Sequence, residues 1–332
     1  MPTSPSGRPV VALACGDPSG IGPEIIIKSL ASPSIRRLAD FVVIGDSRVL
    51  RRTASSMGSG RRRLPANARV ADMGNVQMRS FSFGREKAAY GKASVEYIEE
   101  AYRMVASGAA DCMVTAPINK SSARKSGFKF PGHTEFLAEL SGRDNPVMML
   151  VGGPLKVSLV TRHIALSEVS GRLTTAMVAG TIKTTLESLR SDFGISAPKI
   201  GVAALNPHAG EGGIFGREEI EVVRPAVKKF TNAGASGPIP ADALFYDAYR
   251  GRFDAVVCLY HDQGLIPLKM IARSTGVNVT LGLGFVRTSP DHGTGFDIAG
   301  KDAADPRSME EAIKLAVFMA AKHGKDAYKK RN

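Results

Sequence analysis

Short apolar runs alternate with amphipathic stretches along most of the 332 residues. Runs such as 9–15 (PVVALAC) and 254–260 (DAVVCLY) have the length and composition of buried strands, and the stretches between them have helical length. Because strands that alternate with helices build parallel sheets, this order predicts an α/β fold with a largely parallel sheet. Strands are expected at 9–15, 41–44, 111–115, 147–151, 156–161, 199–205, 254–260 and 277–281, and helices at 22–31, 91–107, 134–141, 171–190, 216–233 and 308–322.

The length of the chain predicts two domains, since a domain averages roughly 150 residues. A hydrophobic content of 43% is sufficient for a sizeable core. The Gly- and Pro-rich segments 126–132 (SGFKFPG) and 282–295 are the best candidates for the joints. We therefore expect the chain to divide near these two segments.

Several classes of protein are excluded by composition. No apolar run approaches the roughly 18 residues of a membrane span, so no membrane partner is expected. The start, MPTSPSGRPV, lacks the basic and apolar regions of a secretory signal. Cys15, Cys112 and Cys258 lie in or beside apolar runs without C-x-x-C spacing, which is typical of reduced, packed thiols. The sequence predicts a cytoplasmic protein.

The net charge is +13, from 44 basic and 31 acidic side chains. The basic residues gather at 51–52, at 61–63 and in the C-terminal KDAYKKRN, with no Trp and no recognition motif for nucleic acid. This distribution argues against a nucleic-acid partner. Solvated loops and attraction of an anionic substrate explain the excess better.

The stretch GDPSGIGPE (16–24) follows the first expected strand and opens a helix. It is no P-loop, since no Gly-Lys-Ser/Thr follows, and the dinucleotide fingerprint fails because position 25 is Ile. Asp17 would also place a negative charge beside a bound phosphate. The glycines and Pro23 predict a tight turn from strand to helix.

Three of the six histidines follow expected strands: His163 in TRHIAL, His208 in NPHAG and His261 in HDQG. In open α/β sheets, ligands bind just beyond the carboxyl ends of the strands. One histidine there is more often structural, but three in equivalent places favour a shared site. The site expected from three imidazoles is a divalent metal with open positions for substrate or water. Imidazole favours Zn, Co or Ni over Mg without fixing the metal.

Two acidic side chains lie in neighbouring loops, Asp242 (PADALF) and Asp262. Either is suited to hold a metal-binding imidazole in place or to accept a proton. Asp242 equally suits the N-cap of a helix, and the two roles are compatible.

His133 and Thr134 open the helix in FPGHTEFLAEL, where Thr134 is either an N-cap or part of an anion site. Lys269, Asn278 and Arg287 flank the HDQG loop and the strand after it. Each alone is typical of a surface or turn residue. Near a metal they would together form a clamp for phosphate and carboxylate.

Long motifs resemble the PdxA family of pyridoxal phosphate biosynthesis, the 4-hydroxythreonine-4-phosphate dehydrogenases. The resemblance runs from about residue 9 to residue 320. The motifs that carry it are GDPSGIGPE, TAPINK, FPGHTEFLAEL, LNPHAGEGG, GPIPAD, YHDQG and GVNVTLGLGFVRTSPDHGTGFDIAGK.

The resemblance implies NAD-dependent (or NADP-dependent) oxidation of the substrate's 3-hydroxyl, followed by loss of CO2 from the β-keto acid. It implies a homodimer with the active site at the subunit interface, where both subunits supply the metal ligands His163, His208 and His261. The implied substrate contacts are His133, Thr134, Lys269, Asn278 and Arg287. Asp242 or a metal-bound hydroxide would accept the hydroxyl proton.

The fold implied is that of the isocitrate and isopropylmalate dehydrogenases, two α/β/α domains with a cleft between them. Residues 1–130 plus 286–332 would form the cofactor-side domain, and 131–285 the domain for metal, substrate and dimerisation. GDPSGIGPE would line a non-Rossmann NAD site. The adenosine end would lie on 291–298, at Asp291, His292, Gly293, Thr294 and Asp297.

The substrate expected is a small phosphorylated hydroxy acid, 4-phosphooxy-L-threonine. The chain departs from the family pattern at 282–285, where GLGF replaces GLPF, at Pro290 and in the loop 271–276. Relatives oxidise 4-phospho-D-threonate or 4-phospho-D-erythronate, and IPLK and FDIAGK resemble that branch. A further branch of the family acts on cis-dihydrodiols. The TAPINK and GHTE motifs are intact in this chain, which argues against its belonging to that branch.

Overall fold

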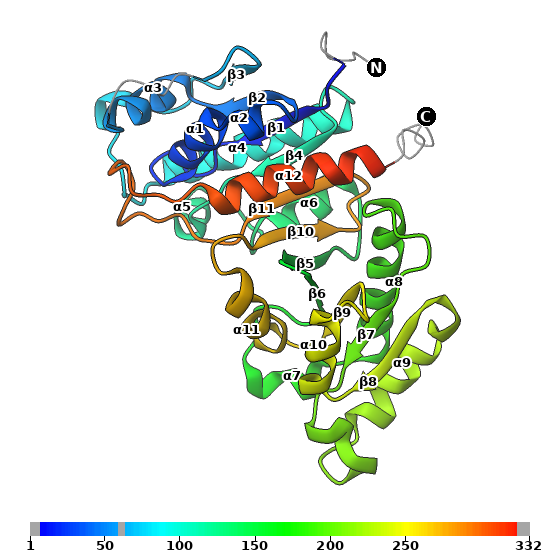
Figure 1. Cartoon of the computed structure of the whole chain (residues 1–332). Helices are drawn as coiled ribbons and strands as arrows, with labels where there is room; N and C mark the ends of the chain where they lie inside the picture. The colour runs from blue at the N-terminus through cyan, green and yellow to red at the C-terminus, as the bar shows by residue number, and fades with distance from the viewer. Residues whose placement is uncertain (1–6, 59–63, 324–332) are drawn as a thin grey trace. The chain divides into compact units, whose positions relative to one another are not determined.

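The computed structural model describes residues 7–58 and 64–323, which form two compact units (Figure 1). The first unit runs to Gly142 and resumes at Gly284, and the second is Arg143–Leu283. The sequence prediction divides the chain at 130/131 and 285/286 instead. The predicted α/β class is confirmed. The basic segment 61–63 and the C-terminal KDAYKKRN lie outside the described residues.

The sheet of the first unit is parallel throughout. Its strand order is β3 (Ala68–Asp72), β2 (Asp40–Gly45), β1 (Val10–Ala14), β4 (Cys112–Thr115) and β11 (Val286–Pro290). The connection from β1 to β2 crosses the sheet toward the β3 edge, whereas the connection from β3 to β4 crosses it in the opposite direction, toward β11. Right-handed crossovers therefore place α1 (Gly22–Ala31) and α4 (Ala88–Ala106) on opposite faces.

The C-terminal helix α12 (Arg307–Lys322) packs on β11 and β4 and contacts α1 (Figure 1). Its Met309, Ile313 and Ala316 recur at helical spacing and are fully buried, which explains why this segment is an amphipathic helix. The shorter helices of the unit are α2 (Pro33–Arg36), α3 (Ser47–Ser56), α5 (Lys120–Lys125) and α6 (His133–Ser141), with a 3-10 turn at Met78–Ser80.

The sheet of the second unit is mixed. Its order is β10 (Val277–Leu281), β5 (Val147–Gly152), β6 (Leu155–Leu159), β9 (Ala255–Cys258), β7 (Ile200–Ala203) and β8 (Ala235–Ile239). β5 is antiparallel to both neighbours, whereas β6, β9, β7 and β8 run parallel. The helices are α7 (Leu166–Arg172), α8 (Thr175–Ser191), a π-helical turn at Glu219–Val223 that continues as α9 (Arg224–Lys228), α10 (Ala241–Tyr249) and α11 (His261–Ala272), with a 3-10 turn at Thr231–Ala233.

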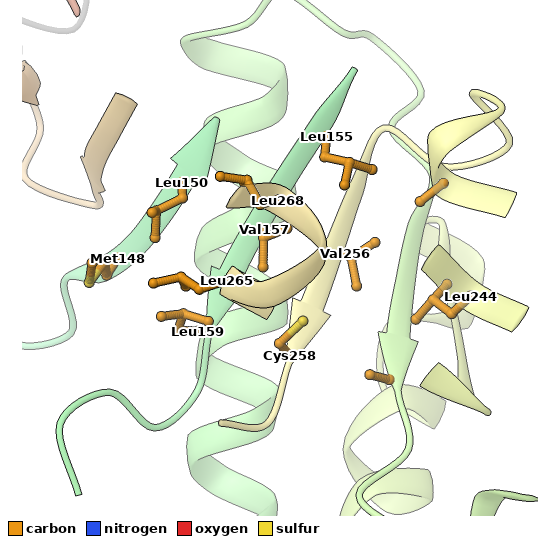
Figure 2. Close-up of a cluster of buried hydrophobic side chains, with 12 residues drawn as sticks. Met148, Leu150, Leu155, Val157, Leu159, Leu244, Val256, Cys258, Leu265 and Leu268 are labelled. Atoms are coloured by element: carbon orange, nitrogen blue, oxygen red, sulfur yellow. The ribbon is translucent and has the colours of Figure 1, made fainter. Parts of the chain in front are cut away.

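Side chains alternate across this sheet, as strand geometry requires. Leu155, Val157 and Leu159 of β6 join a buried cluster that α10 and α11 complete (Figure 2). Ser158 points to the other face, where it lies 2.9 Å from the Thr185 hydroxyl of α8. Each fully buried Leu or Val contributes about 1.5–3 kcal/mol to folding. This packing fixes where the strands end, and so where the loops with the histidines begin.

All eight expected strands are present within a few residues of their predicted bounds. Within the described chain, three strands and five helices lie outside every predicted element: β3, β8, β11, α2, α3, α5, α10 and α11. The predicted helix 171–190 corresponds to α8 and includes only the last two residues of α7. The three cysteines are buried and free, as predicted, and burial raises the pKa of Cys15 to about 12. Within 7–58 and 64–323, no helix has both the length and the apolar character to cross a membrane.

Candidate active site

The three histidines follow the carboxyl ends of three neighbouring parallel strands. β9 pairs with β6 on one side and with β7 on the other. His163 follows β6 by four residues, His261 follows β9 by three, and His208 follows β7 by five. The structure thus places all three at one edge of the second unit's sheet, where the sequence predicted them.

His163 and His261 lie close together, with ring centroids 5.7 Å apart. His261 is the first residue of α11, and its Nδ1 is 2.7 Å from a carboxylate oxygen of Asp262. A carboxylate at that distance accepts the Nδ1 proton, so Nε2 keeps its lone pair. Metal-binding histidines are commonly oriented in this way.

His208 lies in a strained turn. Residues 208–212 all have positive φ, at 53°, 56°, 76°, 41° and 69°, a left-handed stretch that costs roughly 1–2 kcal/mol for each residue other than glycine. The turn projects the His208 side chain, which is 77% exposed and has Nδ1 3.5 Å from Glu211. Strain of this kind persists where the surrounding structure holds it.

Glu219 holds the entry to this turn and is fully buried. One of its oxygens accepts the backbone N–H groups of Leu205 and Asn206, at 2.8 and 2.7 Å. The other accepts from the Asn206 amide at 3.0 Å. Gly210 also packs against this carboxylate, which lies 2.7 Å from where a Cβ would be. Glu219 therefore fixes the backbone that carries His208.

The sequence analysis did not identify Glu219, nor Gln263 of the HDQG motif. Gln263 is buried, accepts the backbone N–H of Leu259 at 2.8 Å and donates to the carbonyl of Ala204 at 2.7 Å. It thereby ties the end of β9 to the end of β7. Its place in the quoted motif was the only available signal, because its partners are backbone groups brought close by the fold.

Two adjacent imidazoles, one with a carboxylate partner, are a suitable donor set for Zn, Co or Ni. Within the described residues of a single chain, no three His, Cys, Asp or Glu side chains are placed to hold a metal together. A metal site in which two subunits together supply the three histidines therefore remains a prediction.

Three loops meet at the carboxyl edge of the first unit's sheet: 15–21 after β1, 116–119 after β4, and 291–298 after β11. The backbone N–H of Asp17 donates to the Pro117 carbonyl, and that of Ile21 donates to the Thr294 carbonyl, both at 3.0 Å. A Cβ at Gly20 would lie 2.4 Å from Thr294, and one at Gly22 would lie 2.0 Å from the Cys15 carbonyl. The glycines of GDPSGIGPE are thus needed for close packing of backbone on backbone.

The two acids of this motif have different surroundings. Glu24 is buried, with one oxygen 2.8 Å from Lys28 Nζ and 2.9 Å from the backbone N–H of Ala304. It anchors the segment that follows 291–298. Asp17 is fully buried, and burial raises its pKa to about 6 even though Ser19 donates to it from both N–H and hydroxyl.

We expect Asp17→Asn to be more stable than wild type, by a difference in free energy of unfolding that increases as pH rises. The raised pKa means that the stability from neutral Asp17 is complete below pH ~4 and is lost as pH rises through about 6. Asn cannot ionise, so the variant's gain in free energy of unfolding should grow by about 1 kcal/mol from pH 5 to pH 8. Denaturant unfolding at both pH values measures this. The exposed Asp144→Asn is the control, and parallel curves for Asp17→Asn and wild type would contradict the prediction.

Arg287 is buried on β11, 3% exposed, and its Nε and Nη2 lie 3.2 and 2.7 Å from the Thr115 hydroxyl. Burial lowers its pKa to about 10, and the nearby Glu135 opposes that shift. His133 begins α6, and its Nε2 is buried without a hydrogen-bond partner in the described structure. Burial, Arg287 and Lys120 together hold the His133 pKa well below its usual value, so His133 is neutral at pH 7.

Thr134 is buried at the second position of α6, and the N-cap is Gly132, so the N-cap interpretation of Thr134 is wrong. The short Gly132 leaves the first turn's N–H groups without a side-chain cap. Asp242 lies exposed in the first turn of α10, where Pro240 is the N-cap, so Asp242 is no N-cap either.

The other predicted site residues are distributed over both units. Lys269 is exposed near the end of α11, and Asn278 is on β10 with a buried Oδ1 that has no hydrogen-bond partner in the described structure. In the loop after β11, the Asp291 N–H donates to the Ser308 hydroxyl at 3.0 Å. The buried Nε2 of His292 has no partner there either.

Gly293 and Asp297 are exposed in the same loop, and Thr294 packs on Gly20 as described above. A Cβ at Gly293 would meet nothing within 4 Å. The open space at Gly293 leaves room for a ligand at this loop.

Comparison with known proteins identifies the family. A family model described as "Pyridoxal phosphate biosynthetic protein PdxA" matches residues 37–316. The chain belongs to the PdxA family. A 4-hydroxythreonine-4-phosphate dehydrogenase from Caulobacter vibrioides is 45% identical, over 96% of this chain and 99% of that protein. A D-threonate 4-phosphate dehydrogenase from Cupriavidus necator is 43% identical, over 95% and 98%.

A solved structure from the same family agrees. The 4-hydroxythreonine-4-phosphate dehydrogenase of Klebsiella pneumoniae superposes with a TM-score of 0.86 at 37% identity, covering 96% of this chain and 99% of that one. The resemblance found in the sequence is confirmed, and the chain has the α/β fold of PdxA dehydrogenases. As a member of this family it is a dehydrogenase.

Proposed function

We propose that the protein oxidises 4-phosphooxy-L-threonine at its 3-hydroxyl and releases CO2, giving 3-amino-2-oxopropyl phosphate. The observation that carries the proposal is the buried guanidinium of Arg287 near the neutral His133, whose buried Nε2 has no hydrogen-bond partner in the described structure. A buried cation next to a neutral imidazole suits an anionic substrate group. The 45% identity to a dehydrogenase named for this substrate supports the choice.

The second candidate substrate is 4-phospho-D-threonate. It is supported by the 43% identity to a D-threonate 4-phosphate dehydrogenase, which is close to the value for the first candidate. Both substrates carry a phosphate and a 3-hydroxyl, so Arg287 and His133 would bind either. The amino group of one is a hydroxyl in the other, and discrimination therefore rests on the side chains that face C2.

The oxidation needs a hydride acceptor, which we assign to NAD or NADP. Its adenosine end would bind the loop 291–298, where His292 offers an imidazole nitrogen and Asp297 a carboxylate suited to a ribose hydroxyl. The nicotinamide would accept the hydride from C3 of the substrate. The three interlocked loops of the first unit hold this segment in place.

His163, His208 and His261 would hold a divalent metal, with Asp262 orienting His261. When bound, the metal supplies Lewis-acid polarisation of the substrate oxygens. Asp242 is our candidate to accept the 3-hydroxyl proton as hydride leaves C3. The resulting β-keto acid then loses its carboxyl group as CO2, and a proton replaces it on carbon.

We further propose a homodimer that forms through the second unit. Of the large apolar side chains that are exposed in the described residues, all but Phe318 lie in this unit. Ile214 and Phe215, 75% and 50% exposed, directly follow the turn that presents His208. Exposed apolar side chains next to an incomplete ligand set suit an interface with a second copy. Such an enzyme would work in the cytoplasm, where its three free thiols stay reduced.

The test is a screen for NADH or NADPH release with 4-phosphooxy-L-threonine, 4-phospho-D-threonate and a cis-dihydrodiol. We expect turnover of a phosphorylated substrate that a chelator removes and Zn, Co, Ni or Mg restores. Turnover of the dihydrodiol alone would overturn the substrate assignment. Activity that survives chelation, confirmed by metal analysis, would overturn the metal assignment, and sedimentation at micromolar concentration tests the dimer.

A further inference from the structure

We propose that Asn206 and Glu219 are positioning residues for metal binding: together they close the base of the loop that presents His208. This inference rests on the proposed function, in which His208 is a metal ligand. Asn206 belongs to LNPHAGEGG, a motif from which the sequence analysis used only the histidine, and Glu219 lies outside every quoted motif. We call the contact between the two side chains the clamp.

The entry to the loop is held through its backbone. The peptide group that joins Ala204 to Leu205 is bonded on both sides. Its carbonyl, from Ala204, accepts from the Gln263 amide at 2.7 Å, and its N–H, from Leu205, donates to Glu219 at 2.8 Å. The same Glu219 oxygen accepts the backbone N–H of Asn206 at 2.7 Å. The chain after β7 is therefore fixed before the turn with His208 begins.

The Asn206 side chain ties the entry of the loop to its exit. Its amide nitrogen lies 2.8 Å from a carboxylate oxygen of Glu218 and 3.0 Å from one of Glu219. An amide nitrogen carries two hydrogens, so it donates one to each acid. Gly216 packs against this contact, since a Cβ there would lie 2.6 Å from the amide nitrogen and 2.4 Å from Glu218. The loop 207–217 is thus closed at its base.

A closed base matters because the turn inside the loop is strained. Residues 208–212 all have positive φ, and three of them, His208 included, are not glycine. Backbone of this kind persists where the surrounding contacts hold it. Gly210, in the middle of the turn, also lies against the buried Glu219 carboxylate. Without the clamp we expect the turn to relax, which would move the His208 imidazole out of its present place.

The clamp also connects the segments that carry the other two histidines. The Ser170 hydroxyl of α7 donates to the second oxygen of Glu218, and α7 begins three residues after His163. Gln263, which holds the entry of the loop, lies two residues after His261 on α11. Bonds to ionised carboxylates are roughly twice as strong as bonds between neutral groups. The network therefore links all three candidate ligands through side chains that are not ligands themselves.

Glu219→Gln keeps the size of the side chain but turns one of its two acceptor atoms into a donor, so that one bond of the clamp is lost. Titration of Co²⁺ into the metal-stripped, full-length protein, followed by visible absorption, measures metal affinity and ligand geometry. We expect the dissociation constant of Co²⁺ to rise at least about tenfold, with a changed spectrum. Glu221→Gln, on the same π-helical turn but exposed, is the matched control and should stay within about twofold of wild type.

A double variant tests whether Glu219 acts through His208. In the His208→Ala background, Glu219→Gln should change the dissociation constant by less than about twofold, because the imidazole that the clamp positions is gone. A full tenfold effect in that background would overturn the inference. Thermal unfolding of the stripped proteins measures stability separately. A lower Tm with wild-type affinity and spectrum would also overturn the inference, since Glu219 would then be structural only.

If Glu219→Gln does not fold, Glu218→Gln is the second variant, because Glu218 is only half-buried. It weakens the other bond of the Asn206 amide and should raise the dissociation constant of Co²⁺ at least about threefold; wild-type affinity would overturn the inference. A wild type that binds no Co²⁺ would contradict the proposed metal site and this inference with it. A wild type that binds Co²⁺ through His208, with the same affinity in Glu219→Gln, would contradict this inference alone.

Discussion

His261→Ala is expected to reduce kcat more than about hundredfold without unfolding the protein. The side chain is partly exposed at the start of α11 and is absent from the buried cluster beneath it, so its loss leaves little cavity. Partners that only orient a metal ligand typically cost 10–100-fold when removed, and the ligand itself should cost more. Steady-state kinetics with added metal and thermal unfolding measure the two effects.

Asp262→Asn provides a graded comparison. The Asp262 carboxylate bonds His261 Nδ1 at 2.7 Å, and an amide oxygen there accepts the same proton without the negative charge. We expect a loss of roughly tenfold in metal affinity, measured by titrating metal into the stripped protein, with the same kcat at saturating metal. His323→Gln, a histidine at the end of α12 in the first unit, is the control.

Wild-type turnover by metal-stripped His261→Ala would contradict the assignment. Unchanged metal stoichiometry in that variant would contradict it as well, and would assign the metal to other ligands. His163→Ala should behave like His261→Ala, because the two rings lie 5.7 Å apart. A loss of stability alone, with full turnover in the folded fraction, would make His261 structural.

The strands that sequence could not predict have a common physical cause. β11 (VRTSP) contains Arg and Pro and lacks an apolar run, although all five of its residues are buried. β8 (ASGPI) contains Gly and Pro and pairs on one side. Such strands form because neighbouring strands supply hydrogen-bond partners, and that information is tertiary.

The missed helix α11 contains Gly264 and Pro267, both of which lower helix propensity. Here Gly264 is required by packing, since a Cβ would lie 2.4 Å from Val157 on β6. The strand ends with their histidines were predictable because apolar runs mark buried strands and the histidines follow them directly. Glu219 and Gln263 were not, because each bonds backbone groups of a different loop that only the fold brings to it.

Arg287→Met is expected to reduce kcat/KM for the phosphorylated substrate by at least about tenfold. Hydrogen bonds to a charged group contribute about 1.5–3 kcal/mol each, and each 1.4 kcal/mol is a factor of ten. Met keeps most of the apolar stem and removes the charge. The loss should be large for the phosphate ester and slight for its dephosphorylated analogue, because the analogue offers the guanidinium no doubly charged group.

Arg287→Lys separates charge from geometry. Lys retains the positive charge, but its ammonium is a single point that cannot present two parallel donors or take the Thr115 hydroxyl and the phosphate in one plane. We expect its kcat/KM to lie between those of wild type and Arg287→Met. If Arg287→Met lowers kcat/KM equally for the phosphorylated and the dephosphorylated compound, Arg287 does not recognise the phosphate. A cis-dihydrodiol, which carries no phosphate, would then be the better candidate substrate.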